Sequence, residues 1–342
     1  MTPYTHGGDV LTARARFGGD VLDCSANLNP LGMPPAVQAA AAAAAADSAR
    51  YPDPLCRALR AAIAAHDGVA DRCLRRRAAE LISGWPTPCV PGGRWSLPGL
   101  RVEEALTAAG CAVTRHPAPG EPLTRRRAGR HRAVEPVFPH PNNPTGRLVD
   151  GRCCGGGEQC RAVGAVLAVD ECFLPLSDGA GPGLAPCLAE HPNLLLLRAF
   201  TKSYAMAGLR LGYALSANGG LLERMAAAGP PWSVSTPAQA AGLAALEQCP
   251  DWPEKARTLL ASERPALSDG LTALGLEVVP GQVNYLLFRA AGAADLKERM
   301  LMRGVLIRSC ANYHGLGNDW YRVCVGQAEQ NRRLLAALKE VL

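Results

Sequence analysis

One stretch of the chain, "RAFTKSYAMAGLRLGYALS" (198–216), brings together an amine and a guanidinium that could do chemistry. Lys202 lies among small, apolar and hydroxyl-bearing neighbours, and Arg210 comes just before the apolar run "LGYAL". A partly desolvated lysine keeps enough neutral amine to form a Schiff base with a carbonyl cofactor. An isolated lysine in such a mixed stretch can equally be a surface residue at a helix edge. Other parts of the sequence have to decide between these two interpretations.

Four short motifs, each weak alone, occur in one order along the chain. They are "PNNPTG" (141–146), "DECF" (170–173), "TK" (201–202) and the single residue Arg210. An Asn-Pro pair is usually only a turn, and an aspartate at a strand end is usually a cap or a solvated carboxylate. The order and separations of the four motifs are nevertheless those that a pyridoxal phosphate enzyme needs. The sequence therefore predicts this cofactor.

Each predicted role follows from the chemistry of the cofactor. Asp170 would pair with the protonated pyridine nitrogen, a charge-assisted contact worth about 1.5–3 kcal/mol, and so keep the ring an electron sink for a carbanion. Asn143 would donate to the phenolic oxygen, and Arg210 would bind the phosphate. Lys202 would form the Schiff base and then transfer protons, which is worth about 10²- to 10⁴-fold in rate.

The size and composition of the chain favour an enzyme of two domains. With 342 residues, 48% of them hydrophobic and 19% charged, the chain can bury a sizeable core. The net charge of +6 comes from dispersed arginines, and the "RRR" runs at 75–77 and 125–127 lack interleaved aromatics, so no nucleic-acid partner is expected. No apolar run approaches the roughly 20 residues that span a bilayer, and the N-terminus lacks the features of a secretory signal. We therefore expect a cytoplasmic enzyme with no membrane partner.

The 13 cysteines raise the question of a metal site. The segment "RCCGGGEQC" (152–160) has two adjacent cysteines and a third six residues further on, and the sequence contains no CxxC pair. This spacing does not match the usual zinc ligands. The three glycines do not make a phosphate loop either, because no strand precedes them and no Lys-Ser or Lys-Thr helix follows. The sequence predicts no metal.

The distribution of apolar runs predicts an α/β fold with a largely parallel central sheet. Runs that read as buried strands are "AVLAVD" (165–170), "LLLLR" (194–198) and "LGYAL" (211–215). Asp170 ends the first run and Lys202 follows the second, so both are expected at the carboxyl ends of strands. Open α/β sheets hold their ligands at that edge.

The two ends of the chain differ from this middle part. The first 35 residues are rich in Gly, Asn and Pro and predict an extended arm, and a helix is expected from Pro34 or Pro35 through the alanines. After about residue 250, "LEVVP", "VNYLLF", "VLIR" and "YRVCV" alternate with helical stretches, as in a smaller α+β domain. We expect an N-terminal arm joining the small domain (1–40), a large cofactor-binding domain (41–245) and a small C-terminal domain (246–342).

The chain resembles fold-type I, aspartate aminotransferase-like enzymes, and among them the threonine-phosphate decarboxylases of cobalamin biosynthesis. The stretch "LRAFTKSYAMAGLRLGY" (197–213) is specific for the superfamily. The motifs "HGG" (6–8), "SANLNPLG" (25–32) and "IRSCANYHGL" (307–316) separate the decarboxylases from histidinol-phosphate aminotransferases. The resemblance implies an aspartate aminotransferase-like fold and a decarboxylation of L-threonine O-3-phosphate to (R)-1-aminopropan-2-yl phosphate that depends on pyridoxal 5'-phosphate.

The same resemblance implies further site residues. Tyr51 of "RYPDP" would reach the cofactor phosphate of a neighbouring subunit, so a homodimer with shared active sites is expected. Arg322 would bind the substrate α-carboxylate as a bidentate pair, a geometry that suits arginine better than lysine, although it could also be a surface arginine at a strand edge. His6, Gly8 and Asn27 would lie over the substrate and help to bind its phosphate, although His6 could also be a disordered N-terminal residue. Arg308 is a further candidate for the phosphate and could equally be an exposed charge on an edge strand.

Residues 73–135 depart from the family pattern. The run "RRR" (75–77) stands where relatives have a Gly-Asn-Gly-Ala type turn, whose bare backbone N–H groups bind the cofactor phosphate. The stretch "PGLRVEEAL" (98–106) lacks the aromatic that stacks on the pyridine ring, and Ala199 replaces a hydroxyl that commonly contacts the phosphate. We therefore expect weakened cofactor affinity.

Two alternative functions stay open. An aminotransferase acting on histidinol phosphate would use the same lysine, asparagine and aspartate. The altered phosphate site also allows a non-catalytic dimeric homologue. Release of carbon dioxide from threonine phosphate without any keto acid would exclude the first alternative. Failure of added pyridoxal phosphate to raise the melting temperature would favour the second, because a ligand of the native state must stabilise it.

Overall fold

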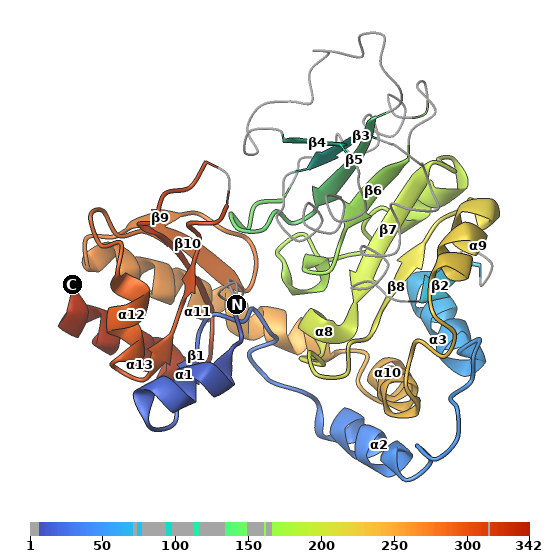
Figure 1. Ribbon diagram of the computed structural model, residues 1–342, viewed down its shortest axis with the longest axis horizontal. Helices are drawn as coiled ribbons and strands as arrows, with labels where there is room; N and C mark the ends of the chain where they lie inside the picture. The colour runs from blue at the N-terminus through green and yellow to red at the C-terminus, as the bar shows by residue number, and fades with distance from the viewer. Residues whose placement is uncertain are drawn as a thin grey trace.

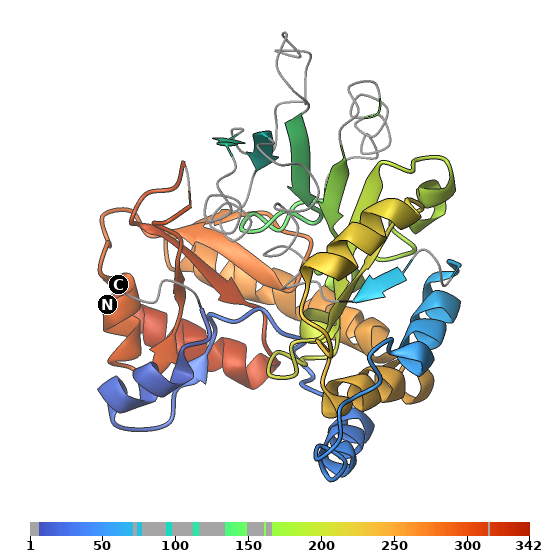
Figure 2. The same ribbon diagram turned by 45° about the vertical axis from the view of Figure 1, so that its right-hand side comes forward.

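The computed structural model describes residues 7–70, 74–76, 94–97, 112–115, 134–148, 161, 166–313 and 315–342. Three sheets occur in this part of the chain: a larger one from the middle of the sequence, a smaller one near the C-terminus (Figure 1), and a two-stranded one that joins the N-terminal arm to the C-terminal part. The N-terminal arm lies beside the C-terminal elements in both views (Figures 1 and 2). The α/β architecture that the sequence predicts is present.

The larger sheet has seven strands in the order β2-β8-β7-β6-β5-β3-β4. Their bounds are β2 (Leu74–Arg76), β3 (Arg94–Leu97), β4 (Ala112–Arg115), β5 (Val134–Pro139), β6 (Leu167–Asp170), β7 (Leu194–Ala199) and β8 (Gly212–Leu215). The pairs between β4 and β7 are parallel, whereas β8 runs antiparallel to both β7 and β2. The prediction of a largely parallel sheet is confirmed. Continuous burial along β6, β7 and β8 explains why their sequences are unbroken apolar runs.

Helices and the sheet enclose one apolar core. The elements around the larger sheet are α2 (Pro35–Ala45), α3 (Arg57–Asp67), η2 (Leu174–Leu176), η3 (Ala185–Ala189), α8 (Phe200–Ser203), α9 (Gly219–Ala228) and α10 (Thr236–Gln248). The buried cluster joins α3, β6, β7, β8 and α10, with leucines of the sheet packed against alanines of α10. The predicted helix through the alanine run is α2, and it packs against α10. Proline at its first position fixes a helical φ without losing a hydrogen bond.

The smaller sheet has four antiparallel strands in the order β12-β13-β10-β9. These strands are β9 (Glu277–Val279), β10 (Tyr285–Arg289), β12 (Arg308–Ser309) and β13 (Trp320–Cys324). The helices that pack with them are α11 (Trp252–Ala273), α12 (Leu296–Leu301) and α13 (Ala328–Val341), around a second apolar cluster. The smaller α+β unit expected after residue 250 is present.

The arm is not extended throughout, which corrects the sequence prediction. Residues Val10–Phe17 form helix α1, capped by Asp9, whose carboxylate accepts from Thr12 N, and closed by Gly18 at φ 80°. These are ordinary helix signals, but they lie in a stretch rich in turn residues. Strand β1 (Leu22–Asp23) then pairs in parallel with β11 (Val305–Leu306), which joins the arm to the C-terminal unit.

The predicted domain boundaries at 40/41 and 245/246 stay predictions. The first falls within α2 and the second within α10. Across the described ranges, every helix is too short or too polar to cross a bilayer.

Candidate active site

The carboxylate and the amine predicted to do the chemistry lie at the ends of adjacent parallel strands. Asp170 is the last residue of β6 and pairs in register with Leu197 of β7, and Lys202 follows in α8. The Nζ of Lys202 lies 5.4 Å from the centroid of the Phe173 ring. The arrangement predicted for these two residues, both at the carboxyl edge of the sheet, is therefore present.

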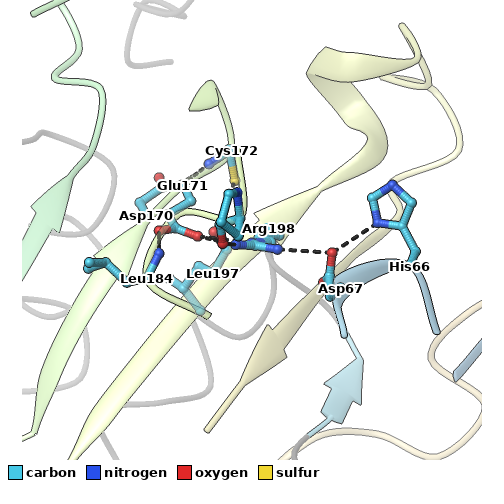
Figure 3. A network of polar contacts seen from close by, with 9 residues as sticks. His66, Asp67, Asp170, Glu171, Cys172, Leu184, Leu197 and Arg198 are labelled. Carbon is cyan, nitrogen blue, oxygen red and sulfur yellow. Dashed lines mark hydrogen bonds and ion pairs between the residues drawn. The ribbon is translucent and has the colours of Figure 1, made fainter. Parts of the chain in front are cut away.

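Asp170 is held in a desolvated position. Burial raises the pKa of its carboxyl group above the ordinary value, and hydrogen bonds from Cys172 and the charge of Lys202 act in the opposite direction. The backbone N–H of Cys172 donates to Asp170 Oδ1 over 3.0 Å, as Figure 3 shows. A desolvated carboxylate of this kind gains most from a further cationic partner, which the pyridinium nitrogen of the predicted cofactor would supply.

The N-terminal arm anchors the short helix that carries Lys202. Asn29 is buried, its backbone N–H donates to Lys202 O over 3.0 Å, and its Nδ2 donates to Ser203 O over 2.7 Å. The side-chain bond satisfies Ser203 O at the end of α8, whereas Lys202 O also accepts from Ala205 N over 3.4 Å. The sequence alone did not predict this role of Asn29. The only available signal was its place in the motif "SANLNPLG".

A buried arginine and the predicted cofactor asparagine lie in direct contact. Arg322 Nη1 donates to Asn143 Oδ1 over 2.5 Å, and its Nη2 donates to Ser25 O over 3.2 Å. The guanidinium also lies over the Tyr285 ring, 5.3 Å from the centroid. Arg322 is only 6% exposed and forms no ion pair with any residue that the structure describes. It is thus a positive charge fixed in direction by neutral partners, not a strand-edge surface residue.

Arg308 lies directly opposite Arg322 across the β12–β13 pair. Its Nη2 donates to Asn312 Oδ1 over 2.9 Å, and its guanidinium lies 5.7 Å from the Tyr313 ring centroid. Burial, with a smaller contribution from the charge of Arg322, lowers the pKa of Arg308. Two like charges in buried, opposite positions favour an anionic ligand between or beside them.

The arm brings a further polar group to this region. Gly8 N donates to Ser25 Oγ over 2.8 Å, and Ser25 is also a partner of Arg322. A Cβ at Gly7 would lie 2.4 Å from Ser25 O, so the chain must be glycine there. Asn27 is 1% exposed, and neither Oδ1 nor Nδ2 has a hydrogen-bond partner within the described ranges. An orphaned amide in a buried position marks a place for a polar ligand. His6 lies outside the described residues.

Two predicted cofactor residues lie on the surface. Arg210 is exposed, has a φ of 56°, and donates from Nη1 to Ala207 O over 3.5 Å. Tyr51 is 78% exposed and stacks on Trp232, with ring centroids 4.3 Å apart. Neither residue has a contact that tests its predicted role in binding the cofactor phosphate.

The segment predicted to lack the phosphate turn is only partly described. Arg75 and Arg76 lie in β2, where they pair with Ala214 and Tyr213 of β8. Arg77, the stretch 98–106 and the cysteine-rich segment 152–160 lie outside the described residues. Ala199 ends β7, three residues before Lys202. No group of three or more metal-ligating side chains occurs in the part of the chain that the structure describes.

Known proteins are similar to this chain over nearly its whole length. The family model "Aminotransferase class I and II" matches residues 136–338. The chain is 35% identical to a threonine-phosphate decarboxylase of Salmonella typhimurium, over 98% of this chain and 96% of that protein. It is 34% identical to a histidinol-phosphate aminotransferase of Nitratidesulfovibrio vulgaris, over 99% of this chain and 94% of that protein.

A solved structure shares the fold. It is a histidinol-phosphate aminotransferase from Sinorhizobium meliloti in complex with pyridoxal-5'-phosphate, with a TM-score of 0.82 and 21% identity, covering 99% of this chain and 95% of that one. The cofactor prediction, pyridoxal 5'-phosphate, is confirmed by these relationships. With its lysine and aspartate at the carboxyl edge of the larger sheet, the chain belongs to the class I and II aminotransferase family.

Proposed function

We propose that this protein decarboxylates L-threonine O-3-phosphate to (R)-1-aminopropan-2-yl phosphate, the side-chain precursor of the cobalamin nucleotide loop. The observation that carries the proposal is the pair of buried arginines, Arg308 and Arg322, in register on neighbouring strands. A substrate with a carboxylate and a phosphate offers an anion to each guanidinium. The 35% identity to a threonine-phosphate decarboxylase supports the same substrate.

The residues on the inner side of the site fit the ring of the cofactor. Pyridoxal phosphate, when bound, supplies an electron sink for the negative charge left at Cα. Asp170 would hold the pyridine nitrogen protonated, since a cation stabilises its desolvated carboxylate. Asn143, half-buried and already fixed by Arg322, would donate from Nδ2 to the phenolic oxygen. Lys202 would carry the cofactor and later hold or deliver a proton at Nζ.

The phosphate end of the cofactor fits less well. Arg210 is an exposed guanidinium with no ion pair within the described ranges, so it is free to bind an anion. Ala199 offers no hydroxyl, and Arg75 and Arg76 offer β-strand backbone with side chains in place of a glycine turn. We propose that cofactor affinity is weakened for this reason. A tight, stoichiometric visible absorbance band in the protein as purified would contradict this proposal.

Arg322 would select the reaction by orienting the substrate. By holding the substrate carboxylate, Arg322 would favour loss of carbon dioxide over loss of a proton, and the cofactor, when bound, would accept the electron pair left at Cα. Asn143 and Ser25 fix the guanidinium on two sides and limit the orientations it can take. Asn27, Gly8, His6 and Arg308 would receive the substrate phosphate.

Replacement of Arg322 tests this assignment. Arg322→Ala should lower kcat/KM for carbon dioxide release at least about thirtyfold, because loss of a buried charge pair costs roughly 2–5 kcal/mol. Cofactor content, read from visible absorbance, should stay unchanged. A variant that decarboxylates at the wild-type rate would show that Arg322 does not bind the carboxylate. Arg289→Ala, on the exposed end of β10, serves as the control.

A second function is favoured by one finding, the 34% identity to a histidinol-phosphate aminotransferase. The two activities separate in one assay: the protein is incubated with threonine phosphate in the absence of any keto acid. A decarboxylase releases carbon dioxide under these conditions, whereas a transaminase releases none. If added pyridoxal phosphate failed to raise the melting temperature, a non-catalytic homologue would be favoured over the decarboxylase and the aminotransferase.

A further inference from the structure

Two cysteines meet where the N-terminal arm lies against the C-terminal elements. Cys24 comes directly after β1 in the arm, and Cys324 is the last residue of β13. The backbone N–H of Cys324 donates to Cys24 O over 2.8 Å, and the backbone N–H of Cys24 donates to Leu306 O over 2.9 Å. The backbone of Cys24 is thus bonded to both β11 and β13, although these strands are distant from it in the sequence.

The side chains of the two cysteines also meet. The thiol of Cys24 is hydrogen-bonded to that of Cys324, and Cys324 Sγ in turn donates to Asp23 O over 3.8 Å. Both cysteines are free thiols. Cys24 is 3% exposed, whereas Cys324 is only half-buried. A buried sulfur therefore lies against a second sulfur that belongs to a residue in contact with solvent.

The backbone spacing at this point suits a disulfide. Two residues that are hydrogen-bonded through their backbones on neighbouring strands have Cα atoms about 5.5 Å apart. A disulfide needs a Cα separation of roughly 4.4–6.8 Å and side chains that point toward each other. The bond from Cys324 N to Cys24 O meets the first condition and the contact between the thiols meets the second.

We propose that Cys24 and Cys324 form a reversible disulfide that ties the N-terminal arm to the smaller sheet. Closing the bond needs no rearrangement of the backbone, because the two residues are already joined through it. A disulfide with one partly exposed residue can be opened again by an external thiol. The pair is thus a site of reversible oxidation outside the groups that carry out the reaction.

The surroundings of the two thiols set the order of the steps. The hydrogen bond with Cys324, together with burial, raises the pKa of Cys24, which is therefore held as a thiol. An oxidant such as glutathione disulfide reacts first at Cys324, whose sulfur loses its proton, attacks one sulfur of the oxidant and releases one glutathione. The sulfur of Cys24 then loses its proton, attacks Cys324 Sγ and releases the second glutathione. Two protein thiols are oxidised, and one glutathione disulfide is reduced to two thiols.

The disulfide restrains the arm beside a contact of the candidate active site. Ser25, directly after Cys24, accepts from Arg322 Nη2 over 3.2 Å through its carbonyl oxygen. Arg322 and Cys324 are two positions apart on β13, so their side chains lie on the same face of the sheet. Oxidation therefore fixes the arm where it holds Arg322. The proposal does not rest on the identity of the substrate or of the reaction.

Peptide mapping without reduction tests the proposal. The holoenzyme is equilibrated with glutathione disulfide, remaining thiols are blocked with N-ethylmaleimide, and the protein is digested with trypsin. The expected peptides 17–50 and 323–332 each contain a single cysteine, Cys24 and Cys324. We expect these two peptides to be recovered as one linked species from most of the chains, and to separate after treatment with dithiothreitol.

Thermal unfolding and two variants provide the controls. The oxidised protein should melt roughly 5 °C higher than the reduced protein, because the link restrains the unfolded chain. Cys324→Ser should abolish both the linked species and this difference. Cys249→Ser, which changes a half-buried cysteine after α10, should keep both.

Three results of the mapping would overturn the proposal. They are glutathione retained on Cys324 without closure, links from either peptide to other cysteines in place of this pair, and both cysteines recovered with the blocking group after equilibration. If Cys324→Ser does not fold, the mapping of the unchanged protein decides alone, since each peptide reports one cysteine.

Discussion

At the scale of single residues, the effect of Asp170 on protein stability depends on whether a cation is bound beside its carboxylate. Because burial raises its pKa in the folded chain, the folded protein binds the carboxyl proton more tightly than the unfolded chain does. The ionised form therefore destabilises the cofactor-free protein at a pH above the raised pKa. The destabilisation fades as the pH falls through that value towards the unfolded one. A bound pyridinium would pair with the carboxylate of Asp170, and the ionised form would then stabilise the protein.

Asp170→Asn should consequently have opposite effects on the two forms of the protein. Without cofactor the variant should melt at a higher temperature than the wild type at pH 7–8, and the difference should shrink towards pH 4. Its affinity for pyridoxal phosphate should fall roughly ten- to hundredfold, because the charge-assisted contact is worth about 1.5–3 kcal/mol. Asp20→Asn, at an exposed site, is the matched control. A lower melting temperature without cofactor at every pH would contradict the account.

At the scale of elements, helix α8, which carries Lys202, is stabilised by contacts with other parts of the chain. Helix α8 has four residues, far fewer than an isolated helix needs. Its position after β7 is set by the sheet, and its end is set by Asn29 from the arm. Fixing Lys202 thus requires the arm, although the arm is distant in sequence.

Asn29→Ala removes the side-chain bond to Ser203 O and keeps the backbone bond to Lys202 O. The free energy of unfolding should fall by about 1–3 kcal/mol, because Ser203 O is left buried and unpaired. The rate at which pyridoxal phosphate reacts with Lys202 should also fall. Asn218→Ala, which removes the cap of α9, should cost a similar stability without changing that rate. Equal effects of both variants on the rate would rule out a positioning role for Asn29.

The sequence was most informative where structure is local. The strands ending at Asp170 and preceding Lys202 were predictable because fully buried strands are unbroken apolar runs. Helix α1 was missed because Asp9 and Gly18 are weak signals among many turn residues. The bond from Asn29 to Ser203 joins residues 174 positions apart, and no local pattern encodes such a contact.

The register that places Arg308 opposite Arg322 could not be predicted from the sequence either. Motif resemblance picked out both residues, but their relation depends on how β12 and β13 pair. The antiparallel direction of β8 could not be read from its apolar run either, since periodicity does not report strand direction.

The whole molecule, on our proposal, is a homodimer that completes each site with Tyr51 of the other subunit. The 78% exposure of Tyr51 and its stacking on Trp232 leave an aromatic surface open to such a partner. Co-expression of Lys202→Ala with Tyr51→Ala tests the sharing. Mixed dimers would contain one intact site and should regain activity that neither variant has alone. Mixed dimers shown by mass to exist, yet no more active than Tyr51→Ala alone, would rule out sharing.

The central claim is the covalent role of Lys202, and reduction followed by peptide mapping measures it most directly. The protein is saturated with pyridoxal phosphate, reduced with borohydride and digested. We predict the phosphopyridoxyl group on the peptide that contains Lys202, and its loss in Lys202→Arg. An unmodified Lys202 under saturating cofactor, with the label elsewhere or absent, would contradict the enzyme assignment.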